Sequence, residues 1–146
     1  MSFFDAINVS ASGLTAERVQ MDVTAENLAN AQSTNNGTPY KPQAVLLQSV
    51  GSGGQFQTQL AGALGGNTGT PGGVQVAGIV SENVPAQLVY DPGSPQANAQ
   101  GYVKEPNIQP VTEMTNMIQE SNSYQADVTA METAKQMYIT TLGLLK

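Results

Sequence analysis

Side chains suited to catalysis are scarce in this sequence. It contains no His and no Cys, which removes the commonest general base, thiolate nucleophiles and the usual zinc ligands. Ser52 and Ser94 follow glycines but form no nucleophile elbow, and no His is present to activate them. Glu82 and Asp91 are isolated carboxylates, which are weak evidence for acid–base chemistry or for calcium binding. We therefore expect no catalytic residue, no metal site and no cofactor.

The other acidic side chains lie mainly near the two ends of the chain. We expect most of these carboxylates to be solvated charges on polar helix faces: Glu17, Asp22, Glu26, Glu113, Glu120, Asp127 and Glu132. Only 5 Lys and Arg oppose 11 Asp and Glu, for a net charge of -6, which argues against a nucleic-acid surface. The glycine-rich stretch lacks the Lys-Ser or Lys-Thr of a phosphate loop, so we expect no small-molecule substrate.

Proline and glycine divide the chain into three parts. All 8 prolines lie between Pro39 and Pro110, and both ends are free of proline. This distribution predicts an N-terminal helical segment (1–34), a small β-rich or irregular middle (35–109) and a C-terminal helical segment (110–146). The expected fold is mainly α, with the two long helices forming a coiled-coil-like pair.

The first helix is predicted from about Phe4 to Ala31. Apolar residues recur every seven positions along one side: Ile7, Leu14, Met21 and Leu28. This spacing is typical of a coiled-coil seam and also of a helix in a small bundle. A second stripe indicates neighbours on more than one side: Val9, Ala16, Val19 and Val23. We expect Asn27 and Asn30 to end the helix by hydrogen-bonding nearby backbone.

The second helix is predicted from Pro110, a residue that suits a first helical turn, to about Leu145. Its apolar stripe comprises Met114, Met117, Tyr124, Val128, Met131, Tyr138 and Leu142. In an antiparallel pair this longer helix overhangs the first, and an exposed apolar stripe usually marks a partner surface. We expect both helices to be partly unfolded in the isolated chain and ordered in an assembly.

The middle segment contains short strand signals. Apolar runs predict strands near residues 44–47, 74–80 and 87–90, with the last two paired as a hairpin. Residues 35–37 and 91–95 are typical of turns. Residues 51–73 are rich in glycine and are predicted to be a flexible loop.

The sequence gives no sign of a membrane span or of a cleavable secretion signal. No apolar run approaches the roughly 18 residues that a membrane helix needs. Residues 1–5 lack the basic segment that opens a signal peptide. If the protein leaves the cytosol, we expect it to use a route that needs no such signal.

Motifs at both ends resemble those of the bacterial flagellar axial proteins. They lie at residues 8–18 and 25–31, and at residues 113–118, 123–127 and 134–137. Residues 89–95, 97–98 and 101–108 resemble the corresponding segments of proximal rod proteins of the FlgC type. The motif residues singled out by this resemblance are Asn27, Asn30, Asp91, Pro92, Gly101, Tyr102, Pro106 and Asn107. Two departures are Ser94, where the family usually has His, and the long glycine-rich segment.

The resemblance implies a structural subunit of the flagellar rod, which transmits torque from the membrane ring to the hook. Such a subunit is exported through the flagellar type III apparatus without a cleaved signal and assembles in the periplasm. Its implied partners are other proximal and distal rod subunits, the membrane-ring adapter and the export apparatus.

The expected assembly interface joins the stripes of the two helices: Ile7, Leu14, Met21, Leu28, Met114, Met117, Tyr124, Val128, Met131, Tyr138 and Leu142. Two other functions stay open at this point. One is a small secreted surface-adhesion protein that assembles through coiled-coil helices, and the other is an enzyme with unconventional carboxylate chemistry.

Overall fold

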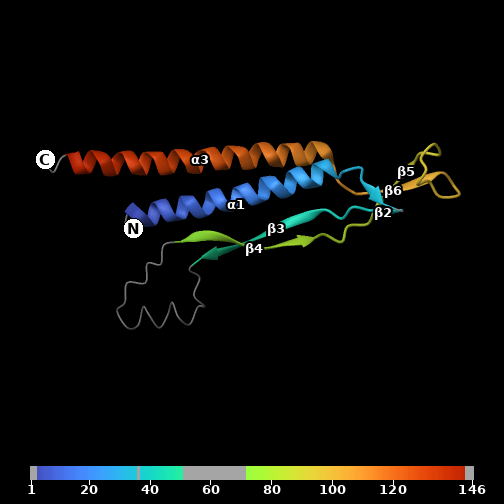
Figure 1. Ribbon diagram of the computed structural model, residues 1–146, viewed down its shortest axis with the longest axis horizontal. Coiled ribbons are helices and arrows are strands. Elements are labelled where there is room, and N and C mark those ends of the chain that lie inside the picture. The colour runs from blue at the N-terminus through green and yellow to red at the C-terminus, as the bar shows by residue number, and fades with distance from the viewer. Residues whose placement is uncertain (1–2, 36, 51–71, 144–146) are drawn as a thin grey trace, which may run out of the picture. The chain divides into compact units, whose positions relative to one another are not determined.

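The computed structural model of the chain describes residues 3–35, 37–50 and 72–143. In chain order, the long helix α1 (Phe3–Ala29) comes before a middle made of short strands, and the long helix α3 (Pro110–Gly143) follows it (Figure 1). The prediction of a mainly helical chain with a small β-rich middle is confirmed. Pro110 is the first residue of α3, as predicted, because the first helical turn needs no N–H from it.

The described strands form three separate two-stranded sheets. In chain order they are β1 (Thr34–Asn35), β2 (Thr38–Pro39), β3 (Gln43–Val50), β4 (Gly73–Ser81), β5 (Gln87–Tyr90) and β6 (Tyr102–Glu105). The pairs are β1–β2, β3–β4 and β5–β6. β1 and β2 pair antiparallel on either side of the predicted turn at residues 35–37, and Gly37 has φ of 75°, while Asn36 itself lies outside the described residues.

The predicted hairpin between residues 74–80 and 87–90 is wrong. β4 pairs with β3, and the Glu82 N–H donates to the Pro42 carbonyl at 2.7 Å just beyond the strand ends. β5 instead pairs with β6, in the register Leu88 to Lys104 and Tyr90 to Tyr102. The physical reason is length: β3 has 8 residues to pair along the 9 of β4, whereas β5 has 4.

The chain divides into two compact units, each containing part of both helices. The first unit comprises Met1–Arg18, Leu47–Ala77 and Asn122–Lys146. The second unit comprises Val19–Leu46 and Gly78–Ser121. Most of the predicted loop 51–73 lies outside the described residues, as does Leu145.

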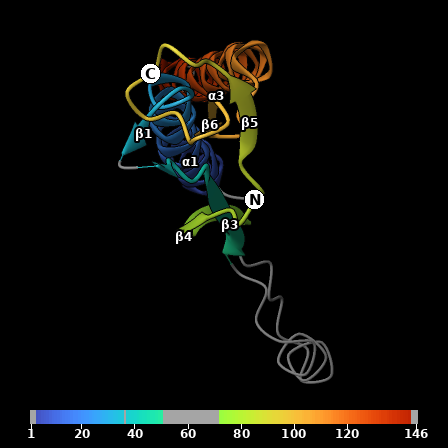
Figure 2. The same cartoon turned by 90° about the vertical axis from the view of Figure 1, so that its right-hand side faces the viewer.

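Within each unit, a stretch of α1 lies antiparallel to a stretch of α3 (Figures 1 and 2). In the first unit the rings of Phe4 and Tyr138 lie 6.2 Å apart between centroids. In the second unit the Thr24 hydroxyl donates to the Glu120 carboxylate at 2.9 Å. Buried apolar side chains among the described residues are few and mostly small: Ala16, Val23, Ala31, Val103 and Pro106. Neither helix, over its described length, is apolar enough to cross a membrane.

Candidate assembly surfaces

Helix α3 buries no side chain completely within the described chain. Its half-buried residues recur at helical spacing and lie on the side that faces α1: Glu113, Asn116, Met117, Glu120, Ser121, Tyr124, Asp127, Val128, Met131 and Ala134. Met117, Tyr124, Val128 and Met131 of the predicted interface therefore lie on this inner side. Met114, Tyr138 and Leu142 are more exposed, at 52%, 41% and 48%.

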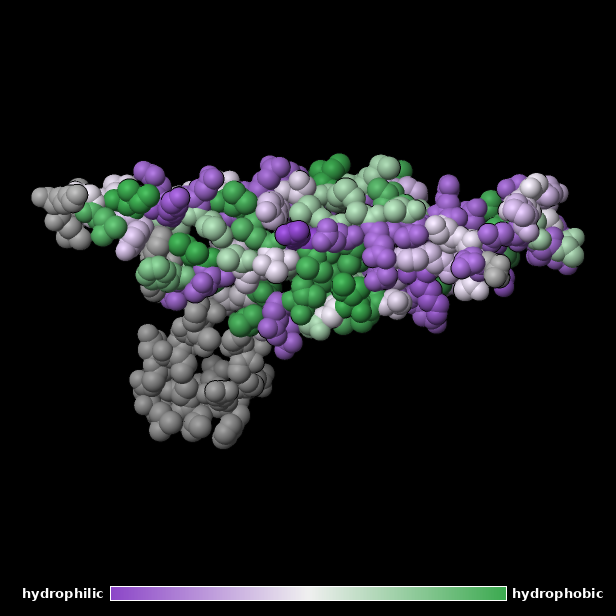
Figure 3. All heavy atoms as spheres, viewed as in Figure 1, coloured by the Kyte–Doolittle hydropathy of each residue, from purple (hydrophilic) through white to green (hydrophobic). Residues whose placement is uncertain are grey.

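The opposite side of α3 carries the most exposed large apolar side chains of this helix in the second unit. Val111, Met114 and Ile118 are 77%, 52% and 62% exposed, and we call the exposed residues of α3 between Val111 and Gln119, which also include Thr112 and Thr115, its outer face. Hydrophobic surface is visible along α3 in Figure 3. The outer face contains no charged residue, because the charges between Pro110 and Met131 are Glu113, Glu120 and Asp127, all half-buried.

Threonines on the exposed side of α3 use their hydroxyls within the helix. Thr115 and Thr129 donate to the carbonyls of Val111 and Gln125, both at 2.8 Å. Thr133, Thr140 and Thr141 make the same contact four residues back, at 2.8 to 2.9 Å. Because each hydroxyl proton is used inside the helix, the surface offers fewer hydrogen-bond donors than the sequence indicates.

The C-terminal end of α3 is a second apolar surface, within the first unit. Tyr138 packs against Phe4, which lies one residue after the start of α1. Helix α3 continues beyond this contact to Gly143. Met137, Ile139 and Leu142 are 66%, 51% and 48% exposed. Met137–Gly143 is called the C-terminal end of α3 below.

The predicted seam of α1 is only half-buried. Ile7, Leu14, Met21 and Leu28 all have this intermediate burial. The buried positions of α1 come instead from the second stripe, Ala16 and Val23, and from the polar residues Thr24 and Asn27. Sequence reasoning had no signal for burying Thr24 and Asn27, because their partners lie far along the chain.

Asn27 joins α1 to the start of β3. Its Nδ2 donates to the Gln43 carbonyl at 2.8 Å, and its Oδ1 accepts from the Gln43 N–H at 2.9 Å and from the Tyr40 hydroxyl at 3.2 Å. The expectation that Asn27 caps nearby helix backbone is therefore wrong. Asn30 does bond locally, since its Nδ2 donates to the Glu26 carbonyl at 2.9 Å.

Among the remaining motif residues, Asp91, Gly101 and Tyr102 shape the loop between β5 and β6, whereas Pro106 and Asn107 follow β6. The Asp91 side chain accepts from the Gly93 N–H at 3.1 Å in the predicted turn. Gly101 has φ of 80°, and a Cβ there would lie 3.0 Å from the Tyr90 ring. Tyr102 packs edge-on against Tyr90, with ring centroids 5.2 Å apart. Pro92 and Asn107 are exposed, whereas Pro106 is buried.

Asn98 organises this loop; it lies in the segment 97–98 that carries the family resemblance but is not singled out as a site residue. Its Oδ1 accepts from the backbone N–H groups of Gln100 at 2.9 Å and Tyr102 at 3.0 Å. Asn is common in turns because its side chain can accept hydrogen bonds from the backbone N–H groups that follow it. The residue type alone could therefore have indicated this role for Asn98.

The carboxylates of α3 are placed differently from the sequence-based expectation. Glu113, Glu120 and Asp127 lie seven residues apart on the half-buried side rather than on a solvated face. Burial raises the pKa of Glu113 and the pKa of Glu120 above the ordinary glutamate value. In the first unit, a Cβ at Gly13 would collide with the Asp127 carboxylate. Between Pro110 and Met131, the charged side chains of α3 thus lie on the side that faces α1, together with Met117, Tyr124, Val128 and Met131.

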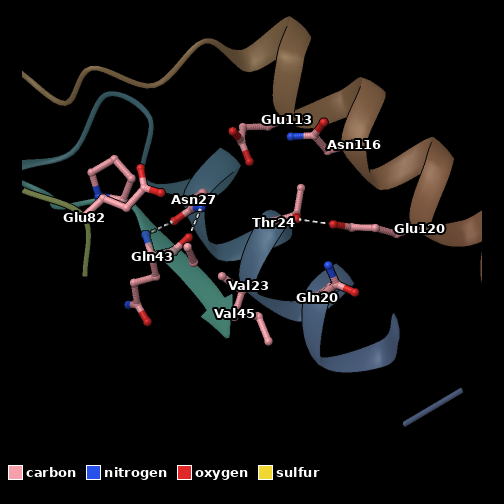
Figure 4. A pocket seen from close by; sticks show the side chains of 12 residues that line it. Gln20, Val23, Thr24, Asn27, Gln43, Val45, Glu82, Glu113, Asn116 and Glu120 are labelled. Carbon is pink, nitrogen blue, oxygen red and sulfur yellow. Dashed lines mark hydrogen bonds between the residues drawn. The ribbon is translucent and has the colours of Figure 1, made fainter. Parts of the chain in front are cut away.

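A pocket of about 270 Å³ lies in the second unit between α1, β3 and α3 (Figure 4). It is lined by Thr24, Asn27, Glu82, Glu113 and Glu120, among others. No group of three or more His, Cys, Asp or Glu in the described residues is arranged to hold a metal ion.

Two family models match the chain. One described as "Flagella basal body rod protein" matches residues 7–36, and one described as "Flagellar basal body rod FlgEFG protein C-terminal" matches residues 99–144.

Full-length relatives share the same name, flagellar basal-body rod protein FlgC. The protein of Bacillus subtilis (strain 168) is 42% identical over 152 residues, covering 100% of both chains. The protein of Salmonella typhimurium is 37% identical over 99% of this chain and 98% of the relative. The protein of Borreliella burgdorferi is 34% identical over 100% of this chain and 99% of the relative.

Proposed function

We propose that this chain, which belongs to the FlgC family of flagellar basal-body rod proteins and is a structural subunit of that rod, contacts neighbouring rod subunits through α3. The surfaces proposed are the outer face and the C-terminal end of α3. The relatives favour this function over the surface-adhesion alternative, because they are named basal-body rod proteins and match over their whole length. They also give no support to an enzymatic function, since they are structural proteins.

The observation that carries the proposed contact is the distribution of charge on α3. Between Pro110 and Met131 the charges lie on the half-buried side, whereas Val111 and Ile118 are the most exposed large apolar residues there. A helix normally turns its apolar side toward its neighbour and its charges toward water. An uncharged outer face is therefore suited to an apolar neighbouring helix, and it has no charge that the contact would desolvate.

We propose that the interface residues predicted from sequence divide into two groups. The first group packs α1 and α3 within one subunit: Ile7, Leu14, Met21, Leu28, Met117, Tyr124, Val128 and Met131. The second group, Met114, Tyr138 and Leu142, contributes to contacts between subunits. Head-to-tail contacts that do not close produce a helical filament, which is the geometry of a rod.

The proposed setting is the periplasmic rod, which transmits torque from the membrane ring to the hook. Other proximal and distal rod subunits and the membrane-ring adapter are the proposed neighbours. Export through the flagellar apparatus without a cleaved signal is also proposed, because it delivers the chain to that site.

The test of this function is imaging of basal bodies by electron cryo-tomography in cells that lack the chain. We expect rings with no rod beyond them, and restoration of the rod when the wild-type gene is returned. Intact rods and hooks in the deletion strain would contradict the proposal.

A further inference from the structure

The contact between α1 and α3 in the second unit depends on carboxylates without a basic partner. The Thr24 hydroxyl donates to Glu120 Oε1 at 2.9 Å. The second oxygen, Oε2, is buried and finds no hydrogen-bond partner among the described residues. Glu113, seven residues before Glu120 on α3, lines the same pocket as Asn27 of α1. Both α1 residues are themselves buried, at 7% and 6% exposure.

Three carboxylates share the pocket at this contact. Figure 4 shows Glu113 and Glu120 projecting from α3 toward α1, with Glu82 across the pocket. The other described residues that line it are Gln20, Val23, Thr24, Asn27, Pro42, Gln43, Ala44, Val45 and Asn116. None of these is Lys or Arg, so the lining provides no positive charge to offset the three carboxylates.

Groups from the surrounding elements do not change this balance. The nearby titratable or charged residues are Asp22 and Glu26 on α1, Tyr40 and Lys41 before β3, Glu82 after β4, and Glu113 and Glu120 on α3. Lys41 is exposed and does not line the pocket. Tyr40 donates its hydroxyl to Asn27 rather than to a carboxylate.

We propose that the α1–α3 contact of the second unit is a proton-responsive clasp, formed by Thr24, Asn27, Glu113 and Glu120, that tightens when its two carboxyl groups are protonated. Protonation removes the repulsion among the three carboxylates. It also gives Glu120 an O–H group in place of a buried anionic oxygen that has no partner, which costs less free energy in a buried position.

The direction of the pH dependence follows from the raised pKa values. Burial raises the pKa of Glu113, together with repulsion from Glu120 and Glu82, and outweighs the opposing effect of the Asn27 side chain. Burial likewise raises the pKa of Glu120 and outweighs the Thr24 hydrogen bond. The folded chain thus holds these protons more tightly than the unfolded chain. The loss of folding stability that ionisation of Glu113 and Glu120 causes is absent well below the ordinary glutamate pKa of about 4.3. It grows as pH rises toward the folded-state values and is complete above them.

The test compares full-length wild type with the double variant Glu113→Gln and Glu120→Gln at pH 4 and pH 7.5. Glutamine keeps an oxygen that can accept from Thr24 but carries no charge. We expect the double variant to raise the thermal unfolding midpoint by about 2 to 4 °C at pH 7.5 and to change it much less at pH 4. The matched control is Glu132→Gln, which neutralises an exposed carboxylate on the same helix. It should change the thermal unfolding midpoint by equal, small amounts at pH 4 and at pH 7.5.

Equal shifts at the two pH values, or a lower midpoint for the double variant at pH 7.5, would overturn the clasp. A second measurement needs no variant: NMR titration of the carboxyl carbons of Glu113 and Glu120 in the wild-type chain. Titration midpoints above about 4.3 for both groups support the proposal, and midpoints at or below that value overturn it. Both experiments use the isolated chain, so their failure would leave the proposed rod function untouched.

Discussion

The Asn27 side chain hydrogen-bonds the backbone of Gln43 in the way that a neighbouring strand would. It pairs with both the N–H and the carbonyl of that residue, at 2.9 and 2.8 Å, from a nearly fully buried position. Removing it leaves two backbone groups without partners, and an unsatisfied buried group costs about 1 to 3 kcal/mol. Asn27 therefore fixes where the strand β3 begins relative to α1.

We expect Asn27→Ala to lower the free energy of unfolding by about 2 kcal/mol or more. The measurement is denaturant unfolding followed by helical circular dichroism. Asn30→Ala is the control, because Asn30 only donates to the Glu26 carbonyl of its own helix on an exposed turn. Equal losses from the two variants would show that the Asn27 contact with Gln43 contributes no more stability than the local bond.

Gly101 allows a second comparison at the residue scale. Gly101 has a positive φ of 80°, and a Cβ added there would lie 3.0 Å from the Tyr90 ring. Gly37 has a similar φ of 75°, but a Cβ added there would have no atom within 4 Å. We expect Gly37→Ala to cost about 1 kcal/mol, from conformation alone. Gly101→Ala should cost clearly more because the ring must move. Equal unfolding free energies for the two variants would contradict the steric part.

At the scale of single elements, the outer face of α3 makes a prediction about assembly. Ile118→Asp places a charge on this uncharged face, at a residue that is 62% exposed, so we expect the monomer to fold normally. We expect motility to be lost and the exported variant to be absent from purified basal bodies, because the charge would be desolvated in the contact.

Ala25→Asp is the matched control for Ile118→Asp. It makes the same change of charge at an exposed position of α1, between Asp22 and Glu26, so rods should form. Normal incorporation of Ile118→Asp would place the contact between subunits elsewhere.

The C-terminal end of α3 is tested in the same way by Leu142→Asp. A charge there should prevent incorporation into the rod while export continues, as measured by secreted subunit and by basal-body composition. Thr133→Asp, on the same helix at an exposed polar residue outside both proposed surfaces, should be tolerated better. A charge at Met131 is a less direct test, since Met131 is half-buried against α1 and the variant would also disturb the subunit itself.

At the scale of the whole chain, stability is expected to be uneven. Helix α3 has no buried side chain, and its last turns extend past the Phe4 contact. Segments with few buried contacts open readily. We expect the amides of residues 132–143 in the isolated chain to exchange with solvent much faster than those of residues 16–27. In assembled basal bodies the same amides should become protected. Strong protection of residues 132–143 in the isolated chain would argue against ordering on assembly.

The helices were predictable from sequence, but the contacts they make were not. Proline distribution and the position of Pro110 are local signals, and they located both helices. The pairing of β5 with β6 depends on residues that are distant in sequence, and alternation alone could not select Tyr102–Glu105 over Val74–Val80 as the partner. Similarly, nothing in the spacing of Glu113 and Glu120 indicates that they face Thr24 and Asn27 rather than water.

The internal hydrogen bonds of the threonines on α3 affect how a neighbour can sit against it. Thr115 and Thr129 direct their hydroxyl protons into their own helix, and the outer face carries no charge. Apolar contact is non-directional, so its energy changes gradually as one helix slides along another. We expect such a surface to tolerate several slightly different registers. One sequence can then pack against neighbours in non-equivalent positions.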